Sequence, residues 1–280
     1  MLNLGVRAHD FGQRPARELA AVVRAAGFSC VQLALPKALP GFSPEPGQVT
    51  RAVARQIRDA FLEEGIEIAV LGCYINPVHP DPAVREFSLV RFEELLRYAR
   101  DFDCSVVATE TGSLSPDGSF HPGTSDERVF DQLVGAFRRL AVTAEAAGVR
   151  IGIEGVFRAH TVSTHDRMER LINAVGSPAL GVVYDPANFL PASEVGLWEA
   201  SVADALDRFG SRLVAVHAKD CRMDGGNKTG DLVAGTGAVP YPYFLGRLQR
   251  EHPGIPILVE DVNPDTFARA RDFLLKVAGA

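Results

Sequence analysis

The sequence alternates short runs of apolar, often β-branched residues with longer stretches that carry one apolar face. Short runs of this kind predict strands, and apolar residues spaced three and four apart predict helices that bury one side. The alternation repeats eight times. The expected strands are residues 2–8, 30–35, 66–71, 105–109, 149–155, 179–184, 213–218 and 255–261, and the expected helices are 15–26, 46–64, 81–102, 125–147, 165–175, 197–209, 241–251 and 264–277.

Several of these strands, such as VVAT, GVVY and LVAVHA, are nearly continuous apolar runs. Such runs predict burial on both faces, hence a parallel sheet covered by helices. Eight strand–helix units in 280 residues favour a (β/α)₈ TIM barrel, with a doubly wound open sheet as the alternative. No linker or composition shift marks a second domain, so we expect one domain over residues 1–280. The Pro- and Gly-rich stretches 36–47, 76–82, 111–123 and 222–240 each follow a strand and are expected to gather at one face.

The composition of the chain indicates which classes of partner to expect. Hydrophobic residues make up 46%, enough for a large core, and 29 Lys plus Arg against 35 Asp plus Glu give a net charge of −6 without a basic run. We therefore expect no nucleic-acid partner. Four widely spaced cysteines indicate reduced thiols in the cytoplasm, and the lack of a long apolar run predicts neither a secretory signal nor a membrane span. Trp198 and the phenylalanines are assigned to the core or to an interface, which leaves a homo-oligomer open.

Four consecutive expected strands end in a polar residue. The segments IGIEG, VVYDPAN, VAVHAKD and ILVED supply Glu154, Asp185, His217 and Glu260, one strand–helix unit apart. In a closed parallel barrel these side chains converge at the carboxyl ends of the strands. Three carboxylates so close together cannot all ionise without a cation, and with an imidazole they form a ligand set for Mn²⁺, Mg²⁺ or Co²⁺, with Zn²⁺ as the alternative. Each residue alone would also suit a polar rim position or a cap.

The segments GIEG, YDPAN, HAKD and LVED, in this order and spacing, resemble the xylose isomerase-like barrel superfamily. That group holds sugar and sugar-phosphate isomerases and epimerases, inosose dehydratases and type IV endonucleases. The resemblance covers nearly the whole chain and implies that Glu154, Asp185, His217 and Glu260 bind one catalytic metal. It further implies that the two glutamates exchange protons with a small carbohydrate substrate, and that Arg222 contacts a substrate oxygen.

The chain departs from the ketose 3-epimerases at one position and resembles the dehydratases at another. Asn188 stands where those epimerases carry a histidine, and VHAKDCR matches the H-x-K-D-x-R run of inosose dehydratases, which makes Lys219 a substrate or proton-transfer group. Glu110, His79 and His160 follow strands in loops where each either contacts substrate or is a plain loop polar group.

A metal bound by a hydroxyl and a neighbouring carbonyl polarises that carbonyl and stabilises the enediolate formed when the adjacent C–H is lost. The destination of the proton then decides between epimerisation, isomerisation and dehydration. The expected function is a metal-dependent sugar or sugar-phosphate isomerase or epimerase, with an inosose-type or keto-sugar dehydratase as the alternative. A type IV endonuclease is disfavoured by Asn188 and the acidic charge, and a non-catalytic sugar-binding barrel by the retention of all four ligand residues.

Overall fold

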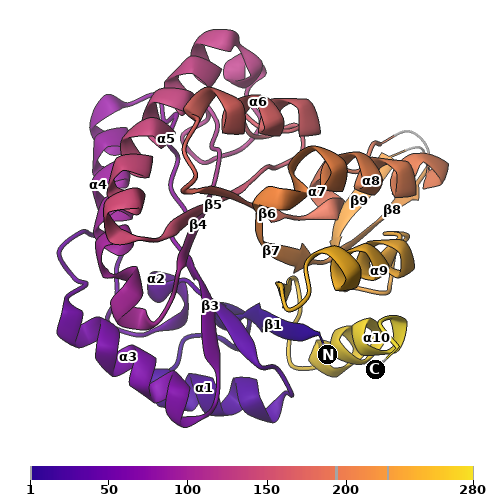
Figure 1. The fold of residues 1–280 in the computed structure, drawn as a ribbon, viewed down its shortest axis with the longest axis horizontal. Coiled ribbons are helices and arrows are strands. Elements are labelled where there is room, and N and C mark those ends of the chain that lie inside the picture. Colours follow the sequence, from indigo (N-terminus) through magenta and orange to yellow (C-terminus); the bar gives the residue numbers. More distant parts are fainter. Residues whose placement is uncertain (1, 193–194, 226, 280) are drawn as a thin grey trace.

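Eight parallel strands close into a barrel in the computed structural model, which describes residues 2–192, 195–225 and 227–279 (Figure 1). Their order around the barrel is β1-β10-β7-β6-β5-β4-β3-β2, and the pairing of β1 with β10 closes it. The predicted TIM barrel is therefore confirmed, and the open sheet is excluded. The strands are β1 (Asn3–Arg7), β2 (Cys30–Leu33), β3 (Glu67–Gly72), β4 (Val106–Glu110), β5 (Arg150–Glu154), β6 (Leu180–Tyr184), β7 (Leu213–Ala218) and β10 (Pro256–Val259).

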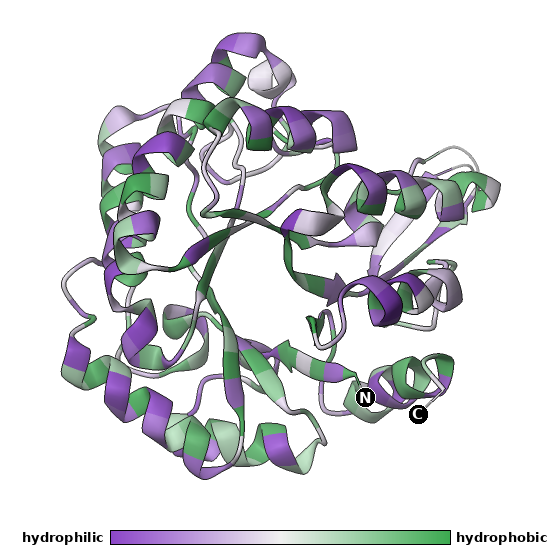
Figure 2. Cartoon of the chain, in the orientation of Figure 1, coloured by the Kyte–Doolittle hydropathy of each residue, from purple (hydrophilic) through white to green (hydrophobic). Residues whose placement is uncertain are grey.

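Helices surround the barrel and mix hydrophilic with hydrophobic residues, as expected for helices that bury one face (Figure 2). They are α1 (Ala16–Ala25), α2 (Leu35–Ala38), α3 (Arg51–Glu63), α4 (Pro82–Tyr98), α5 (Glu127–Ala147), α6 (His165–Val175), α7 (Pro186–Phe189), α8 (Trp198–Phe209), α9 (Tyr241–Glu251) and α10 (Phe267–Val277). None of the helices in the described ranges combines the length and apolarity needed to span a membrane.

The expected helix over residues 46–64 begins later, at Arg51. Thr50 caps α3, since its side chain accepts the backbone N–H of Val53 at 3.3 Å. The preceding residues form a loop instead, because the Glu94 carboxylate accepts the backbone N–H groups of Gly47 and Val49. This loop covers part of one end of the barrel.

Three elements in the loops were not predicted. The one-turn helices α2 and α7 directly follow β2 and β6, and an antiparallel hairpin of β8 (Asp220–Asp224) and β9 (Asn227–Leu232) follows β7. The eighth barrel strand is consequently β10. All three elements lie at the carboxyl ends of strands, where the polar residues of the sequence were expected to meet.

Small and medium side chains fill the barrel interior: Cys30, Ala69, Val70, Val106, Ala108, Val183, Ala215 and Leu258 are buried together. Two glycines complete this layer. A Cβ at Gly5 would lie 2.5 Å from Cys30 Sγ, and one at Gly152 would lie 2.8 Å from Val183 Cγ2. Because alternate residues of a strand point to the same side, the next inward residue along each strand lies at the carboxyl end of the barrel.

Candidate metal centre

The four predicted ligand residues each stand two positions after an inward residue. Glu154 follows Gly152, and the pairs Val183 and Asp185, Ala215 and His217, and Leu258 and Glu260 repeat the spacing. The same phase that places small residues in the interior therefore directs these polar side chains to the centre of the carboxyl end.

The structure brings these four residues together. Glu154, Asp185, His217 and Glu260 each offer one ligand atom, and these atoms all lie within 4.8 Å of one another. Their exposed fractions are 6%, 0%, 1% and 4%. A buried cluster of three carboxylates and one imidazole is costly without a positive charge at its centre.

The imidazole of His217 is held between two glutamates and one amide. Its Nδ1 lies 3.2 Å from Glu154 Oε1 and 3.1 Å from Glu260 Oε1, while Nε2 donates to Gln32 Oε1 at 2.9 Å. The Gln32 amide nitrogen in turn donates to the hydroxyl of Tyr74 at 2.5 Å, which fixes the amide orientation. Because Gln32 occupies Nε2, Nδ1 is the imidazole nitrogen that faces the carboxylates and is available as a metal ligand.

Asp185 and Asn188 are positioned by the short helix α7. Asp185 caps it, since Oδ1 accepts the backbone N–H of Ala187 at 2.9 Å, and this leaves Oδ2 toward the cluster. Asn188 Nδ2 donates to Glu154 Oε1 at 3.0 Å. At the other end of α7, Lys228 Nζ from β9 donates to the carbonyl groups of Ala187 and Leu190 at 2.8 and 2.7 Å. The hairpin therefore secures the helix that carries two residues of the site.

Lys219 contributes a buried positive charge beside the cluster. Its Nζ lies 3.0 Å from Asp185 Oδ2, 3.2 Å from Asp231 Oδ1 and 3.7 Å from Glu260 Oε2. Burial by itself would lower the pKa of Lys219, but the surrounding carboxylates raise it, so the side chain is an ammonium.

The two glutamates have pKa values shifted in opposite directions. Burial raises the pKa of Glu154 against the opposing effect of His217. Burial would also raise the pKa of Glu260, but His217, Lys219 and Arg7 outweigh it and the pKa is lowered. Arg7 Nη1 lies 3.5 Å from Glu260 Oε1.

A cavity of about 340 Å³ lies over the cluster. Five residues predicted from sequence line it: the two glutamates of the cluster, Glu154 and Glu260, together with Glu110, Asn188 and Lys219. The remaining lining residues come from several loops and strands: Arg7, Lys37, Tyr74, Val156, Phe157, Ala187, Lys228, Gly230 and Asp231. The mixture of charged groups and aromatic rings suits a small polyhydroxylated molecule.

Three other predicted residues do not line this cavity. His160 is buried with Nδ1 3.7 Å from Glu110 Oε2, so it stands behind a cavity wall. His79 Nδ1 accepts the backbone N–H of Asp81 at 3.1 Å and supports the loop before α4. Arg222 is exposed on β8, whereas Lys228 of the paired strand reaches the cavity.

Asp220, next to Lys219 in sequence, forms hydrogen bonds with backbone N–H groups. Its carboxylate accepts the N–H groups of Cys221, Gly235 and Val239 at 2.9, 2.9 and 3.0 Å. A Cβ at Gly237 would lie 2.3 Å from Asp220 Oδ1, which requires glycine there. Asp220 and its sequence neighbour Lys219 form no ion pair with each other, because each residue has other partners.

The chemistry of this donor set fits a divalent cation. His217 Nδ1 has no hydrogen-bond partner among the described residues and lies between two carboxylate oxygens. Cations prefer such a combination of carboxylate and imidazole donors, and a cation here would offset the charge of three buried carboxylates. Oxygen donors predominate, as expected for a hard divalent ion.

Sequence reasoning missed Arg7, Gln32, Tyr74, Lys37 and Lys228. Two of them carried a usable signal: Arg7 and Gln32 stand two positions after the inward Gly5 and Cys30, in the same phase as the predicted ligands. Tyr74 and Lys37 lie beyond strand ends, in loops whose path depends on tertiary contacts. Lys228 belongs to a hairpin with little apolar pattern.

The chain was compared with known sequences and solved structures. No curated protein matches the sequence. A D-psicose 3-epimerase from Clostridium cellulolyticum H10, solved with D-tagatose, superposes with a TM-score of 0.73 at 17% identity, covering 99% of each chain. A xylose isomerase-like TIM barrel protein from Mycobacterium smegmatis in complex with magnesium superposes with a TM-score of 0.71 at 20% sequence identity, covering 98% of this chain and 93% of that one. The 3-keto-D-glucoside 4-epimerase of E. coli superposes with a TM-score of 0.75 at 14% sequence identity, covering 99% of this chain and 100% of that one.

Identities this low show a shared fold and no more. The sequence profile of the xylose isomerase-like TIM barrel matches residues 20–277, which is nearly the whole chain. The resemblance first seen in four short segments thus extends across the barrel, and the chain belongs to the xylose isomerase-like TIM barrel family.

Proposed function

We propose that this protein is a divalent-metal-dependent sugar or sugar-phosphate isomerase or epimerase. The observation that carries the proposal is the buried cluster of Glu154, Asp185, His217 and Glu260 at the base of a polar cavity. Two of the structural neighbours are by name epimerases of a ketose and of a keto-glucoside, which supports the same class of substrate. Mg²⁺, Mn²⁺ or Co²⁺ fits the oxygen-rich donor set, with Zn²⁺ as the alternative.

In this proposal the four residues hold the ion, and a bound divalent ion supplies Lewis-acid polarisation of a substrate carbonyl. Glu154 and Glu260 then divide the proton chemistry. They come from β5 and β10, which are separated by β6 and β7 around the barrel, so they face the substrate from different sides. One glutamate takes a proton from the carbon beside the carbonyl, and the other returns one from the opposite side.

Other side chains orient the reacting groups. Asn188 holds Glu154 Oε1 by a hydrogen bond, and Arg7 lies against Glu260 Oε1. Each contact fixes one carboxylate oxygen and leaves the other oxygen of that residue for the substrate or the ion. Lys37 and Lys228 place ammonium groups in the cavity wall, where they suit hydroxyl or phosphate oxygens of a sugar.

The test is hydrogen exchange in D₂O. Ketoses, ketose phosphates, 3-keto sugars and inososes are incubated with the Mg²⁺- or Mn²⁺-loaded protein, and NMR follows deuterium entering the carbon beside the carbonyl. We expect incorporation with at least one sugar class, lost in Glu260→Gln and retained in Glu199→Gln, which removes an exposed carboxylate on α8. Absence of incorporation across the panel would contradict the proposal.

A keto-sugar or inosose dehydratase is the second candidate, and the position of Lys219 favours it. An ammonium 3.0 Å from Asp185 and 3.7 Å from Glu260 is placed to protonate a departing hydroxyl. A dehydratase should form a dehydrated product in the same NMR assay, and Lys219→Met should lower its kcat by about 10²-fold. If only an epimer or isomer accumulates, the first candidate stands and the second is excluded.

A further inference from the structure

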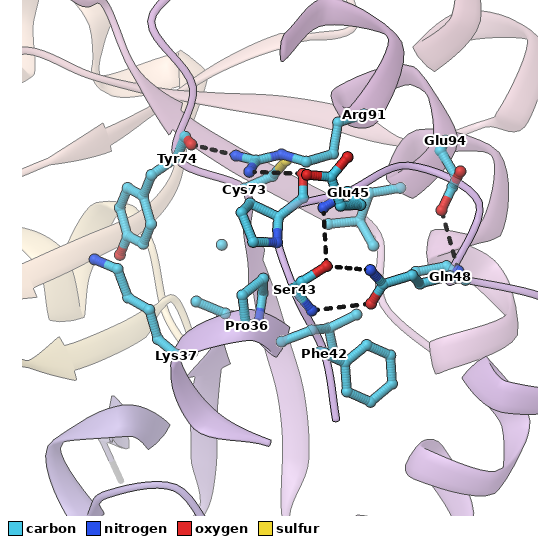
Figure 3. A pocket seen from close by; sticks show the side chains of 16 residues that line it. Pro36, Lys37, Phe42, Ser43, Glu45, Gln48, Cys73, Tyr74, Arg91 and Glu94 are labelled. Atoms are coloured by element: carbon cyan, nitrogen blue, oxygen red, sulfur yellow. Dashed lines mark hydrogen bonds between the residues drawn. The ribbon is translucent and has the colours of Figure 1, made fainter. Parts of the chain in front are cut away.

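A second cavity lies beside the one over the cluster. Its volume is about 170 Å³, and it is bounded by the carboxyl ends of β2 and β3, the helices α2 and α4, and the loop over residues 42–49 (Figure 3). Nine of its lining residues are apolar: Ala34, Leu35, Pro36, Phe42, Pro44, Val49, Gly72, Cys73 and Leu95. None of the residues in its wall belongs to the four-residue cluster.

Two charged side chains of this wall form hydrogen bonds with the backbone. Arg91 from α4 donates to the carbonyl group of Pro44 at 3.3 Å and to that of Tyr74. Glu94, one turn further along α4, accepts the N–H of Val49 at 3.1 Å. These contacts hold the loop over the cavity, as Figure 3 shows, and leave mainly carbon atoms facing its interior.

The two cavities meet at Lys37 and Tyr74, which line both. In Figure 3 these two residues stand side by side at the end of the apolar cavity opposite Gln48 and Glu94. Lys37 Nζ lies 4.2 Å from the centre of the Tyr74 ring. The hydroxyl of Tyr74 bonds to Gln32, the partner of His217, so one residue borders the apolar cavity and contacts the support of the candidate metal centre.

The volume sets what can enter. An apolar cavity of about 150 Å³ inside a protein accommodates benzene, so this one has room for a single aromatic ring or a short branched alkyl group. A free monosaccharide has no such group. A sugar bearing an apolar substituent on its anomeric oxygen would fill both cavities, with the linking oxygen at the Lys37 ammonium.

We propose that the apolar cavity binds the aglycone of a glycoside whose sugar ring lies over the four-residue cluster. The inference rests on the proposed function, and it narrows the substrate class from sugars in general to small aryl or alkyl glycosides. The geometry assigns three parts to this substrate: the sugar in the polar cavity, the glycosidic oxygen at Lys37, and the hydrophobic group between α2, α4 and the loop over residues 42–49.

Calorimetric binding tests this assignment without relying on turnover. The Mg²⁺-loaded protein is titrated with the phenyl and the methyl glycoside of 3-keto-β-D-glucose. We expect the phenyl glycoside to bind at least about tenfold more tightly, the usual scale for filling an apolar pocket. Val49→Trp fills the cavity from the loop and should remove the preference while leaving methyl glycoside affinity unchanged.

Two further variants keep the test decisive. Pro44→Trp fills the same cavity from an exposed loop position and serves if Val49→Trp does not fold. Val142→Trp is the matched control, because Val142 is 70% exposed on α5, and it should keep the preference for the phenyl glycoside.

The outcomes separate this inference from the proposed function. Metal-dependent binding of the methyl glycoside without a phenyl preference would overturn the aglycone site and leave the proposed function standing. A phenyl preference that persists in both filled variants would also overturn it. Failure of both glycosides to bind would overturn the aglycone site for this sugar class, while the proposed function would still be decided by the deuterium-exchange panel.

Discussion

Strands β5, β6, β7 and β10 deliver the four side chains of the buried cluster, whereas β1 to β4 deliver side chains that contact that cluster or bound the cavities beside it. Gln32, two residues after the inward Cys30, forms a hydrogen bond with His217. Arg7, two residues after Gly5, forms an ion pair with Glu260. In both halves, the side chain at the site stands two positions after a residue that faces the barrel interior. Under the proposed function, one half of the rim carries out the chemistry, and the other half orients the ligands and selects the substrate.

The comparison predicts a hierarchy of effects, with the largest in the half that carries the cluster. Removal of divalent metal with a chelator should abolish deuterium exchange into a substrate sugar while circular dichroism stays unchanged. The barrel has a continuous apolar core and does not need an ion to fold. Added Mg²⁺ or Mn²⁺ should restore exchange. Full activity in the chelated protein would mean that the cluster is a network of ion pairs around His217 and Lys219.

The next largest effect is expected at Glu260. Glu260→Gln keeps the shape and one donor oxygen but removes the base, so turnover should fall by about 10²-fold or more. Metal binding, measured by calorimetry, should weaken without being lost. Glu199→Gln on the exposed side of α8 should match the unmodified protein in both measurements. A Glu260→Gln protein that binds metal and turns over at the normal rate would refute the two-glutamate scheme.

In the other half, Gln32 is expected to act through His217. Gln32→Met has a similar shape but accepts no hydrogen bond from Nε2, so the imidazole loses the contact that fixes its tautomer. Metal affinity should fall by about 10- to 100-fold, the range seen when partners of ligating histidines are removed. Gln56→Met, at an exposed position of α3, is the control. Unchanged affinity in Gln32→Met would show that the half formed by β1 to β4 does not support the ligands.

The smallest effect is expected at Arg222. Its side chain is exposed on β8 and does not line either cavity, so Arg222→Ala should leave KM within about twofold. Lys228→Met is the informative partner. Lys228 lines the polar cavity and donates to two carbonyl groups at the end of α7, so its loss should raise KM for a sugar or sugar phosphate. Equal effects of the two changes would remove the distinction between the exposed and inward faces of the hairpin.

The barrel and its four-residue cluster could be predicted because their signals are local. Buried parallel strands leave uninterrupted apolar runs, and a carboxylate or imidazole at the end of such a run is conspicuous. Asp185 and His217 stand out in GVVYD and LVAVH for this reason. The prediction needed only the order of the strands, because the closed barrel brings their ends together.

The supporting contacts could not be predicted in the same way. Gln32 lies inside the run CVQLAL, where one amide is easily assigned to the strand itself, and its partner His217 is remote in sequence. The hairpin β8–β9 is largely exposed, so its residues alternate without a buried face to reveal a strand. The loop that delays the start of α3 to Arg51 depends on Glu94, a residue of a different helix. Each of these features is set by tertiary contacts.

Asp220 has a consequence for the engineering of this barrel. By accepting three backbone N–H groups, it ties the first residue of the hairpin to the segment that returns toward α9, directly after the strand that carries His217. The segment between β7 and α9, which contains the hairpin, is thus held near both of its ends by the Asp220 side chain. A designer who keeps Asp220 and Gly237 can graft a hairpin of different length between them, which would reshape the wall of the polar cavity while the strand that carries His217 keeps its position.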